Sequence, residues 1–167
     1  MKPDQQIKDL YQAYYKDDLD RMDRILEEYL RLSKAKCTLL IDKDGHLVTK
    51  QGQTGTYDTD TISALVAGSF AATKEMARLL GEDEFSVLFH QGMKDAIQLS
   101  LIGERTLLAT IFDDKTTVGM VRLYSNEAAR KLALILSEVK EKKGEGPLMK
   151  GFGDAATGKL DEMFGKS

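Results

Sequence analysis

Residues 62–80 read ISALVAGSFAATKEMARLL, and this stretch decides how the rest of the chain is interpreted. At about 100° per residue, it forms a helix with two different faces. The first face is an apolar stripe of the kind that turns toward a core: Ile62, Leu65, Val66, Ser69, Thr73, Met76 and Leu80. The opposite face carries small residues followed by charged ones: Ala64, Ala67, Ala71, Glu75 and Arg78, with Gly68 at its margin.

The small residues of the second face have two explanations. Alanine is the best helix former, so an exposed alanine needs no binding partner. However, the run Ala-Gly-Ser-Phe-Ala-Ala at 67–72 lies in a chain whose other expected helices have charged outer faces. Because small side chains let another backbone approach closely, we interpret this face as a docking platform for a protein.

The composition limits the classes of function. A chain of 167 residues is most simply one domain with short extensions. The net charge is only −3 and acids and bases are mixed along the sequence, so nucleic acid and anionic membranes are not expected partners. The single cysteine, Cys37, begins an apolar run and is expected to be a buried thiol in a reducing compartment. Without an apolar leader or a membrane-spanning stretch, the expected location is the cytoplasm.

The elements before the two-faced helix are a helix and a hairpin. Asp17 and Asp18 are expected to cap the helix, which ends near Ser33, although the spacing of apolar residues at 7–14 also allows an earlier start or a separate arm. Residues 37–41 and 46–50 form two strands joined by the turn 42–45, in which Asp44-Gly45 favours a hairpin. The two-faced helix ends at Gly81.

The elements after it are three strands and a helix. Apolar runs at 96–102, 106–112 and 118–124 are separated by short links, which favours an antiparallel meander. Ser125 or Asn126 caps the last helix. We therefore predict an α/β (α+β) fold with five strands, the middle helix on one sheet face and the first and last helices on the other. The middle helix is alone on its face, which is a reason to dimerise.

Several short sequences together resemble the Roadblock family, and more narrowly its bacterial MglB subgroup. They are Leu39–Gly45, Leu65–Thr73, Leu79–Glu82, Phe89–Gly92, Ile111–Asp113 and Val118–Leu123. The resemblance implies a five-stranded antiparallel sheet of order 2-1-5-4-3 and a homodimer whose sheets join edge to edge. We therefore expect an N-terminal extension over 1–16 and a Roadblock domain over 17–143, and the repeated glycines after residue 143 predict a flexible tail over 144–167.

The resemblance implies a function in bacterial cell polarity and motility, with concentration at a cell pole. The protein would activate an MglA-type Ras-like small GTPase without being an enzyme itself or needing a cofactor or metal. The implied GTPase-binding residues are Ala64, Ala67, Gly68, Ala71, Lys74, Glu75 and Arg78. An alternative is a Roadblock scaffold that binds a GTPase or other partners without stimulating hydrolysis, and a second is a small-molecule sensor.

Two arginines are candidates for a residue inserted into the partner's active site, Arg78 and Arg105. For Arg78 the structural explanation is a cation at a helix end. The resemblance points to activation without an inserted arginine, by positioning the catalytic residues of the GTPase itself.

The tail contains helically spaced apolar residues, Leu160, Met163 and Phe164, which form either a second GTPase contact or a frayed tail. Other motifs are set aside. Residues 151–156 match a dinucleotide fingerprint without the strand that must precede it, and the turn 42–45 lacks the later ligands of a calcium loop. His46 and His90 lie too far apart in sequence for a recognisable metal-ligand spacing.

Overall fold

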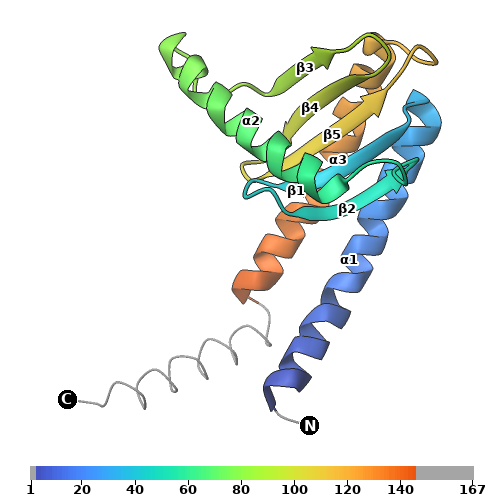
Figure 1. Ribbon diagram of the computed structural model, residues 1–167. Helices are drawn as coiled ribbons and strands as arrows, with labels where there is room; N and C mark the ends of the chain where they lie inside the picture. The colour runs from blue at the N-terminus through green and yellow to red at the C-terminus, as the bar shows by residue number, and fades with distance from the viewer. Residues whose placement is uncertain (1–2, 146–167) are drawn as a thin grey trace. The chain divides into compact units, whose positions relative to one another are not determined.

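The computed structural model describes residues 3–145, and their side chains over 15–139 (Figure 1). The chain divides into two compact units, residues 21–133 and the combination of residues 1–20 with 134–167. In the second unit, Asp18 and Ile135 are buried. No helix among residues 3–145 combines the length and apolarity needed to cross a membrane. The elements are α1 (Pro3–Ser33), β1 (Cys37–Asp42), β2 (Leu47–Gly52), α2 (Thr59–Leu79), β3 (Val87–Gln91), β4 (Ala96–Ile102), β5 (Thr106–Phe112) and α3 (Val118–Glu145).

The unit of residues 21–133 is built on one antiparallel sheet of five strands, with the order β2-β1-β5-β4-β3. Leu39 of β1 lies opposite Ala109 of β5, and Ala109 lies opposite Leu99 of β4. The predicted fold class and strand order are therefore confirmed. Strands β2 and β3 form the two edges of the sheet.

The two faces of this sheet are covered differently. Helix α2 lies on one face, and the parts of α1 and α3 that belong to this unit lie on the other (Figure 1). On the α2 face, Val66, Ala67 and Phe70 pack with sheet residues such as Leu39 and Leu107 in one buried cluster. Burial of this apolar surface is the main favourable contribution to the stability of the fold.

The opposite face contains buried polar side chains as well as apolar ones. The Tyr29 hydroxyl of α1 lies 2.7 Å from Thr110 Oγ1 of β5. Gln98 Nε2 of β4 donates to Ser125 Oγ of α3 over 2.8 Å. These hydrogen bonds satisfy polar groups that would otherwise be costly to bury, and they link each helix to a particular strand.

Local residue chemistry explains the connections that frame α2. Asp42 Oδ1 accepts hydrogen bonds from the backbone N–H groups of Asp44 and His46, which closes the β1–β2 turn. Asp58 caps α2, and bonds from the hydroxyl and N–H of Thr61 lower the pKa of its carboxyl group. Helix α2 ends before Gly81, which has a φ of +81°, as predicted.

Residues 118–124 are the first turns of α3, so the predicted strand there is wrong. Val121 is buried completely, and Thr117 Oγ1 accepts a hydrogen bond from the N–H of Met120 at the helix start. The third strand of the meander is instead β3, residues 87–91, which pairs with β4. Val118-Gly-Met-Val resembles a strand because its apolar residues fit either periodicity over so short a run.

The predicted starts of the first and last helices also differ from the structure. Helix α1 continues from Pro3 to Ser33 without a cap at Asp17 or Asp18, which selects the earlier start. Helix α3 begins at Val118 and passes through Ser125 and Asn126. Ser125 is buried in α3 and bonds to Gln98, so its hydroxyl serves the packing against the sheet.

Candidate protein-docking surface

The core-facing side of α2 is rotated from the predicted apolar stripe. The buried side chains include Ser63, Val66, Ala67, Phe70 and Ala77. Three members of the predicted stripe are exposed: Leu65 by 67%, Met76 by 53% and Leu80 by 73%. Val66, Ala67 and Phe70 face the sheet in the buried cluster, which rotates the predicted stripe partly away from it. The three larger side chains therefore lie beside the core.

The structure exposes six of the seven predicted GTPase-binding residues on the outside of α2. We call these six residues the platform: Ala64, Gly68, Ala71, Lys74, Glu75 and Arg78. Ala67, the seventh, is only 7% exposed and belongs to the buried cluster under α2, so its inclusion in an accessible surface is wrong. The predicted tail contact at Leu160, Met163 and Phe164 lies outside the described residues.

The N-terminal half of the platform is held close to the β1–β2 turn. Gly45 has a φ of +95°, and a Cβ atom placed on it would lie 3.0 Å from Ala64 Cα and 3.5 Å from Ala67 Cβ. Glycine and alanine are therefore needed on the two sides of this contact. Because the turn supports Ala64 from one side, the small-residue half of the platform has a fixed backbone.

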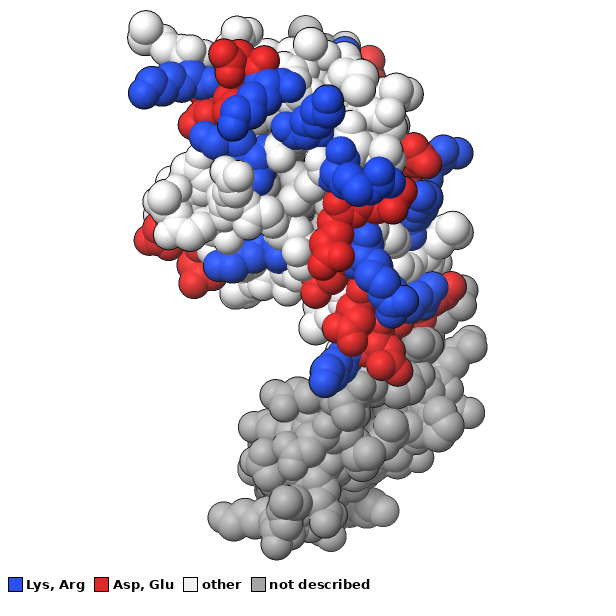
Figure 2. Space-filling model, turned by 90° about the vertical axis from the view of Figure 1, so that its right-hand side faces the viewer, with Lys and Arg blue, Asp and Glu red and all other residues white. Residues whose placement is uncertain are grey.

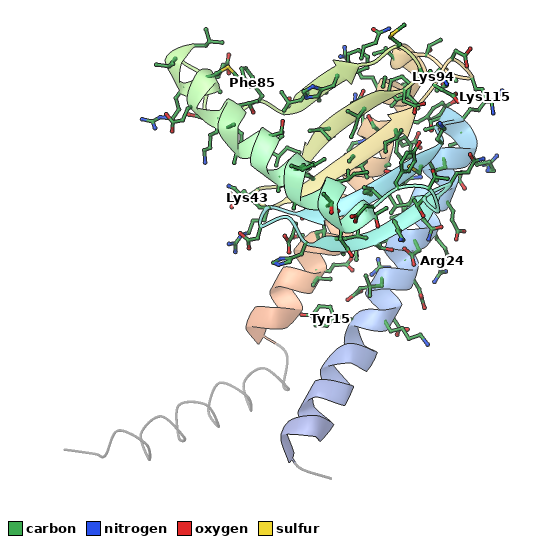
Figure 3. The ribbon with its side chains drawn as sticks, viewed as in Figure 1. Tyr15, Arg24, Lys43, Phe85, Lys94 and Lys115 are labelled. Carbon is green, nitrogen blue, oxygen red and sulfur yellow. The ribbon has the colours of Figure 1, made fainter. Side chains whose placement is uncertain are left out.

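The C-terminal half of the platform is charged. Arg78 Nη1 donates to both carboxylate oxygens of Glu75, over 3.0 and 3.2 Å, and both side chains are largely exposed. The Arg78 guanidinium is thus engaged on its own helix. Arg105 lies in the β4–β5 turn, where its carbonyl accepts the N–H of Lys43 over 2.8 Å. Figure 3 shows Lys43 at one end of the sheet and Lys94 and Lys115 at the other.

A second exposed apolar region lies beside α2. Helix α2 contacts β1 and β2, whereas Leu88, Ile97 and Leu101 of β3 and β4 pack at the border of the buried cluster and are only partly buried. We call Leu65, Met76 and Leu80 the seam residues, because these exposed apolar side chains lie about 100–180° around α2 from Ala64 and Ala71. The β3 edge of the sheet pairs with no other strand among the described residues.

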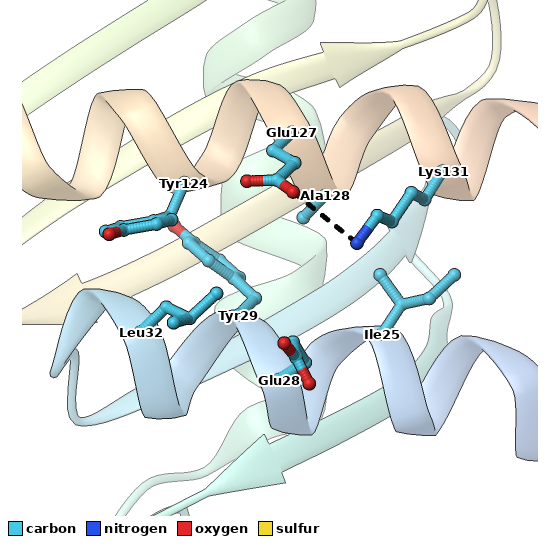
Figure 4. A pocket seen from close by; sticks show the side chains of 8 residues that line it. All are labelled: Ile25, Glu28, Tyr29, Leu32, Tyr124, Glu127, Ala128 and Lys131. Carbon is cyan, nitrogen blue, oxygen red and sulfur yellow. Dashed lines mark ion pairs between the residues drawn. The ribbon is translucent and has the colours of Figure 1, made fainter.

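The groove between α1 and α3 offers little room for a small molecule. It encloses only about 10 Å³, it is open to solvent, and Glu127 and Lys131 form an ion pair of 3.6 Å along its α3 wall (Figure 4). The lining residues are Ile25, Glu28, Tyr29, Leu32, Tyr124, Glu127, Ala128 and Lys131. Typical small-molecule sites are larger, at about 300–1,000 Å³. The geometry therefore gives no support to the small-molecule sensor.

The remaining chemically active side chains do not form a reaction site. Within the described part of the chain, no group of three or more His, Cys, Asp and Glu side chains is arranged to hold a metal ion. Cys37 is fully buried, as predicted, and burial raises the pKa of its thiol to about 11. His46 Nδ1 lies 3.2 Å from Asp42 Oδ2 at the surface. In Figure 2, acidic and basic side chains are intermixed along one side and at the top of this face, and an area with few charged side chains lies beside them.

Comparison with known proteins places this geometry in a family. The Roadblock/LC7 domain profile matches residues 21–112. The structure of Myxococcus xanthus MglB is 36% identical and has a TM-score of 0.68, with 70% of this chain and 95% of that chain covered. The gliding protein MglB of Thermus thermophilus is 35% identical with a TM-score of 0.71, covering 74% and 94%. An MglB structure described as having a tetrameric arrangement is 35% identical with a TM-score of 0.72, covering 74% and 93%.

Proposed function

Because this chain belongs to the Roadblock/LC7 family, we propose that it is a GTPase-activating regulator that docks an MglA-type Ras-like small GTPase on the platform of α2. The observation that carries the proposal is the exposure of Ala64, Gly68 and Ala71 on one helix surface. These small side chains allow a partner's backbone to approach closely. The similarity to MglB, in one case described as a gliding protein, supports a role in motility. We propose that the protein acts in bacterial cell polarity and motility, in the cytoplasm and concentrated at a cell pole.

The functional unit in this proposal is a homodimer. The seam residues expose large apolar side chains next to a sheet face that α2 covers only in part. A second copy of α2, placed there by a twofold axis, buries both sets of side chains and brings the two β3 edges together. The two platforms then lie next to each other and form one surface. The tetrameric arrangement described for an MglB supports self-association in this group of proteins.

The proposed activation works by positioning rather than by an inserted arginine. Hydrolysis of GTP requires an oriented water molecule and neutralisation of charge on the transferred phosphoryl group. Arg78 donates to Glu75 on its own helix, and Arg105 lies in the β4–β5 turn, outside the platform. A rigid platform instead stabilises the switch loops of the GTPase in the arrangement that places its own catalytic residues.

The experiment that tests the proposal is GTP turnover by a cognate MglA-type GTPase with and without this protein. We expect stimulation by the wild type and loss of both binding and stimulation for Ala71→Arg, because the new side chain prevents close approach. The matched control is Leu134→Arg, which places the same charge on another exposed helix position. Binding without stimulation by the wild type would identify a Roadblock scaffold, and equal activity of the Ala71→Arg variant would exclude the platform.

A second GTPase contact by Leu160, Met163 and Phe164 also stays a proposal. Their helical spacing after a glycine-containing stretch is typical of a docking peptide on a flexible arm. Deletion of residues 145–167 is expected to weaken the complex while the platform still binds. Unchanged affinity and turnover after this deletion would exclude the contact.

A further inference from the structure

Leu79 is the most exposed leucine in the described part of the chain, at 87%. It lies in the last turn of α2, where Ala77 is completely buried. This turn is therefore fixed to the core through Ala77 while Leu79 points away from it. Single exposed apolar side chains are common on protein surfaces. The direction and surroundings of Leu79 therefore decide whether it has a role.

Leu79 lies at the margin of the platform, on the side of the seam: at about 100° per residue it is about 60–80° from Ala64 and Ala71, and about 40° from both Glu75 and the seam residue Leu65. At about 100° per residue, Leu79 lies about 180° around the helix from the buried Phe70 and within about 20° of Gly68 and Ala72. A partner that contacts Gly68 and Ala72 reaches Leu79 as the first large apolar side chain toward the C-terminal end of α2. Leu80 lies about 100° further round, on the side of the seam residues.

The backbone that carries Leu79 is well anchored. The N–H of Leu80 bonds to the carbonyls of Met76 and Ala77, and the N–H of Glu82 bonds to the Ala77 carbonyl over 2.9 Å. Phe85 is partly buried beside this turn of the helix (Figure 3). Because the backbone is already ordered, binding through Leu79 costs little conformational entropy.

The surroundings of Leu79 indicate the chemistry of its partner. Glu82 and Asp83 are exposed directly after the helix, and the Glu75–Arg78 ion pair lies one turn before its end. The apolar side chain is thus flanked by more acidic groups than basic ones. A complementary surface has an apolar pocket with Lys or Arg side chains at its rim.

We propose that Leu79 is the anchor residue of the GTPase-docking surface, and that it enters an apolar pocket of the GTPase bordered by basic side chains. This inference rests on the proposed function and adds a specificity-determining residue to it. Anchor residues are usually surrounded by weaker contacts that exclude water. In this proposal the small residues of the platform make those contacts. The acidic neighbours Glu82 and Asp83 increase the rate at which the protein associates with the basic rim of the GTPase pocket.

The test compares two adjacent substitutions, Leu79→Asp and Leu80→Asp. The probe is an MglA-type GTPase loaded with a non-hydrolysable GTP analogue, with affinity measured by calorimetry and oligomeric mass by light scattering. We expect Leu79→Asp to weaken binding by about tenfold or more while the protein stays dimeric. Leu80→Asp is expected to dissociate the dimer, and Leu79→Met is expected to retain near-normal affinity because its side chain still fills an apolar pocket.

The outcomes separate this inference from the proposed function. If the wild type binds and Leu79→Asp binds equally well, the anchor is excluded while the platform stands. If Leu79→Asp dissociates the dimer, Leu79 belongs to the seam and the inference is wrong. If the wild type does not bind the loaded GTPase, the proposed function and the inference both fail. As an independent check, Glu82→Gln combined with Asp83→Asn is expected to lower the association rate and reduce its dependence on salt.

Discussion

The hydroxyl of Tyr29 in α1 lies 2.7 Å from Thr110 Oγ1 in β5, and this buried hydrogen bond joins the first helix to the strand at the centre of the sheet. Tyr29 is 2% exposed and Thr110 1%. A polar pair at this depth favours one position of the helix on the sheet, because a shifted helix would break this buried hydrogen bond.

Tyr29→Phe is expected to lower the free energy of unfolding by about 1–2 kcal/mol, since Thr110 then loses its buried partner. Urea denaturation at a fixed protein concentration measures the change. Tyr124→Phe is the control, because the Tyr124 ring is only partly buried. Equal stability of the wild type and Tyr29→Phe would show that the hydrogen bond contributes nothing net.

The same side chain predicts a pH dependence. Burial raises the pKa of Tyr29 from 10.0 to about 12, although hydrogen bonds with Thr110 and Ser125 act in the opposite direction. The folded protein holds the tyrosine proton more tightly than the unfolded chain, so this stabilisation is present below pH 10 and is lost as the pH rises toward 12. We expect the wild type to lose more stability over this interval than Tyr29→Phe.

Gly45→Ala is expected to destabilise the protein by about 1–3 kcal/mol, because a φ of +95° disfavours any residue with a Cβ and the new atom would press on Ala64 Cα. Thermal denaturation measures the effect. The matched control is Gly55→Ala, where a Cβ meets no atom within 4 Å and the change is expected to be small. Similar losses in both variants would contradict the proposed contact between the turn and α2.

Met76→Asp is expected to convert the proposed dimer into a monomer of 18.6 kDa, because a charge would replace an apolar side chain at the seam. Light scattering coupled to gel filtration reports the mass. Leu134→Asp, at another exposed leucine, is expected to leave the mass unchanged. A wild type that is itself monomeric would exclude this seam.

Arg78→Ala is expected to leave GTPase stimulation within about twofold of the wild type, since its guanidinium is engaged by Glu75. Single-turnover GTP hydrolysis and binding are measured together. An inserted arginine accelerates hydrolysis by about 10³–10⁵-fold. A loss of that size with unchanged binding would therefore replace the positioning mechanism with an arginine finger.

Much of the fold follows from local sequence chemistry. The Asp44-Gly45 turn, the helix end at Gly81 and the strand runs of β1, β4 and β5 are all where the sequence predicts them. Each depends on residues close together in the chain, such as a glycine at positive φ or an apolar run between turn residues. The helical spacing of small residues likewise predicts the exposed small-residue surface of α2.

At residues 118–124, the local spacing of apolar residues is not enough to distinguish a helix from a strand. Their apolar residues suit a strand, yet the capping hydroxyl of Thr117 and the burial of Val121 make them helical. The sequence pattern does not predict strand β3, because its residues are at most half-buried at the sheet edge and its alternation of apolar and polar positions is weak.

Sequence pattern alone was enough for β1, β2, α2, β4 and β5 and for the two unlike faces of α2, and the family resemblance supplied the strand order. Only the tertiary structure decided which side of α2 meets the sheet, placing Ala67 inside and Leu65, Met76 and Leu80 outside. The physical reason is that apolar periodicity identifies side chains that avoid water. The periodicity is the same whether those side chains are covered by the protein's own sheet or by another molecule.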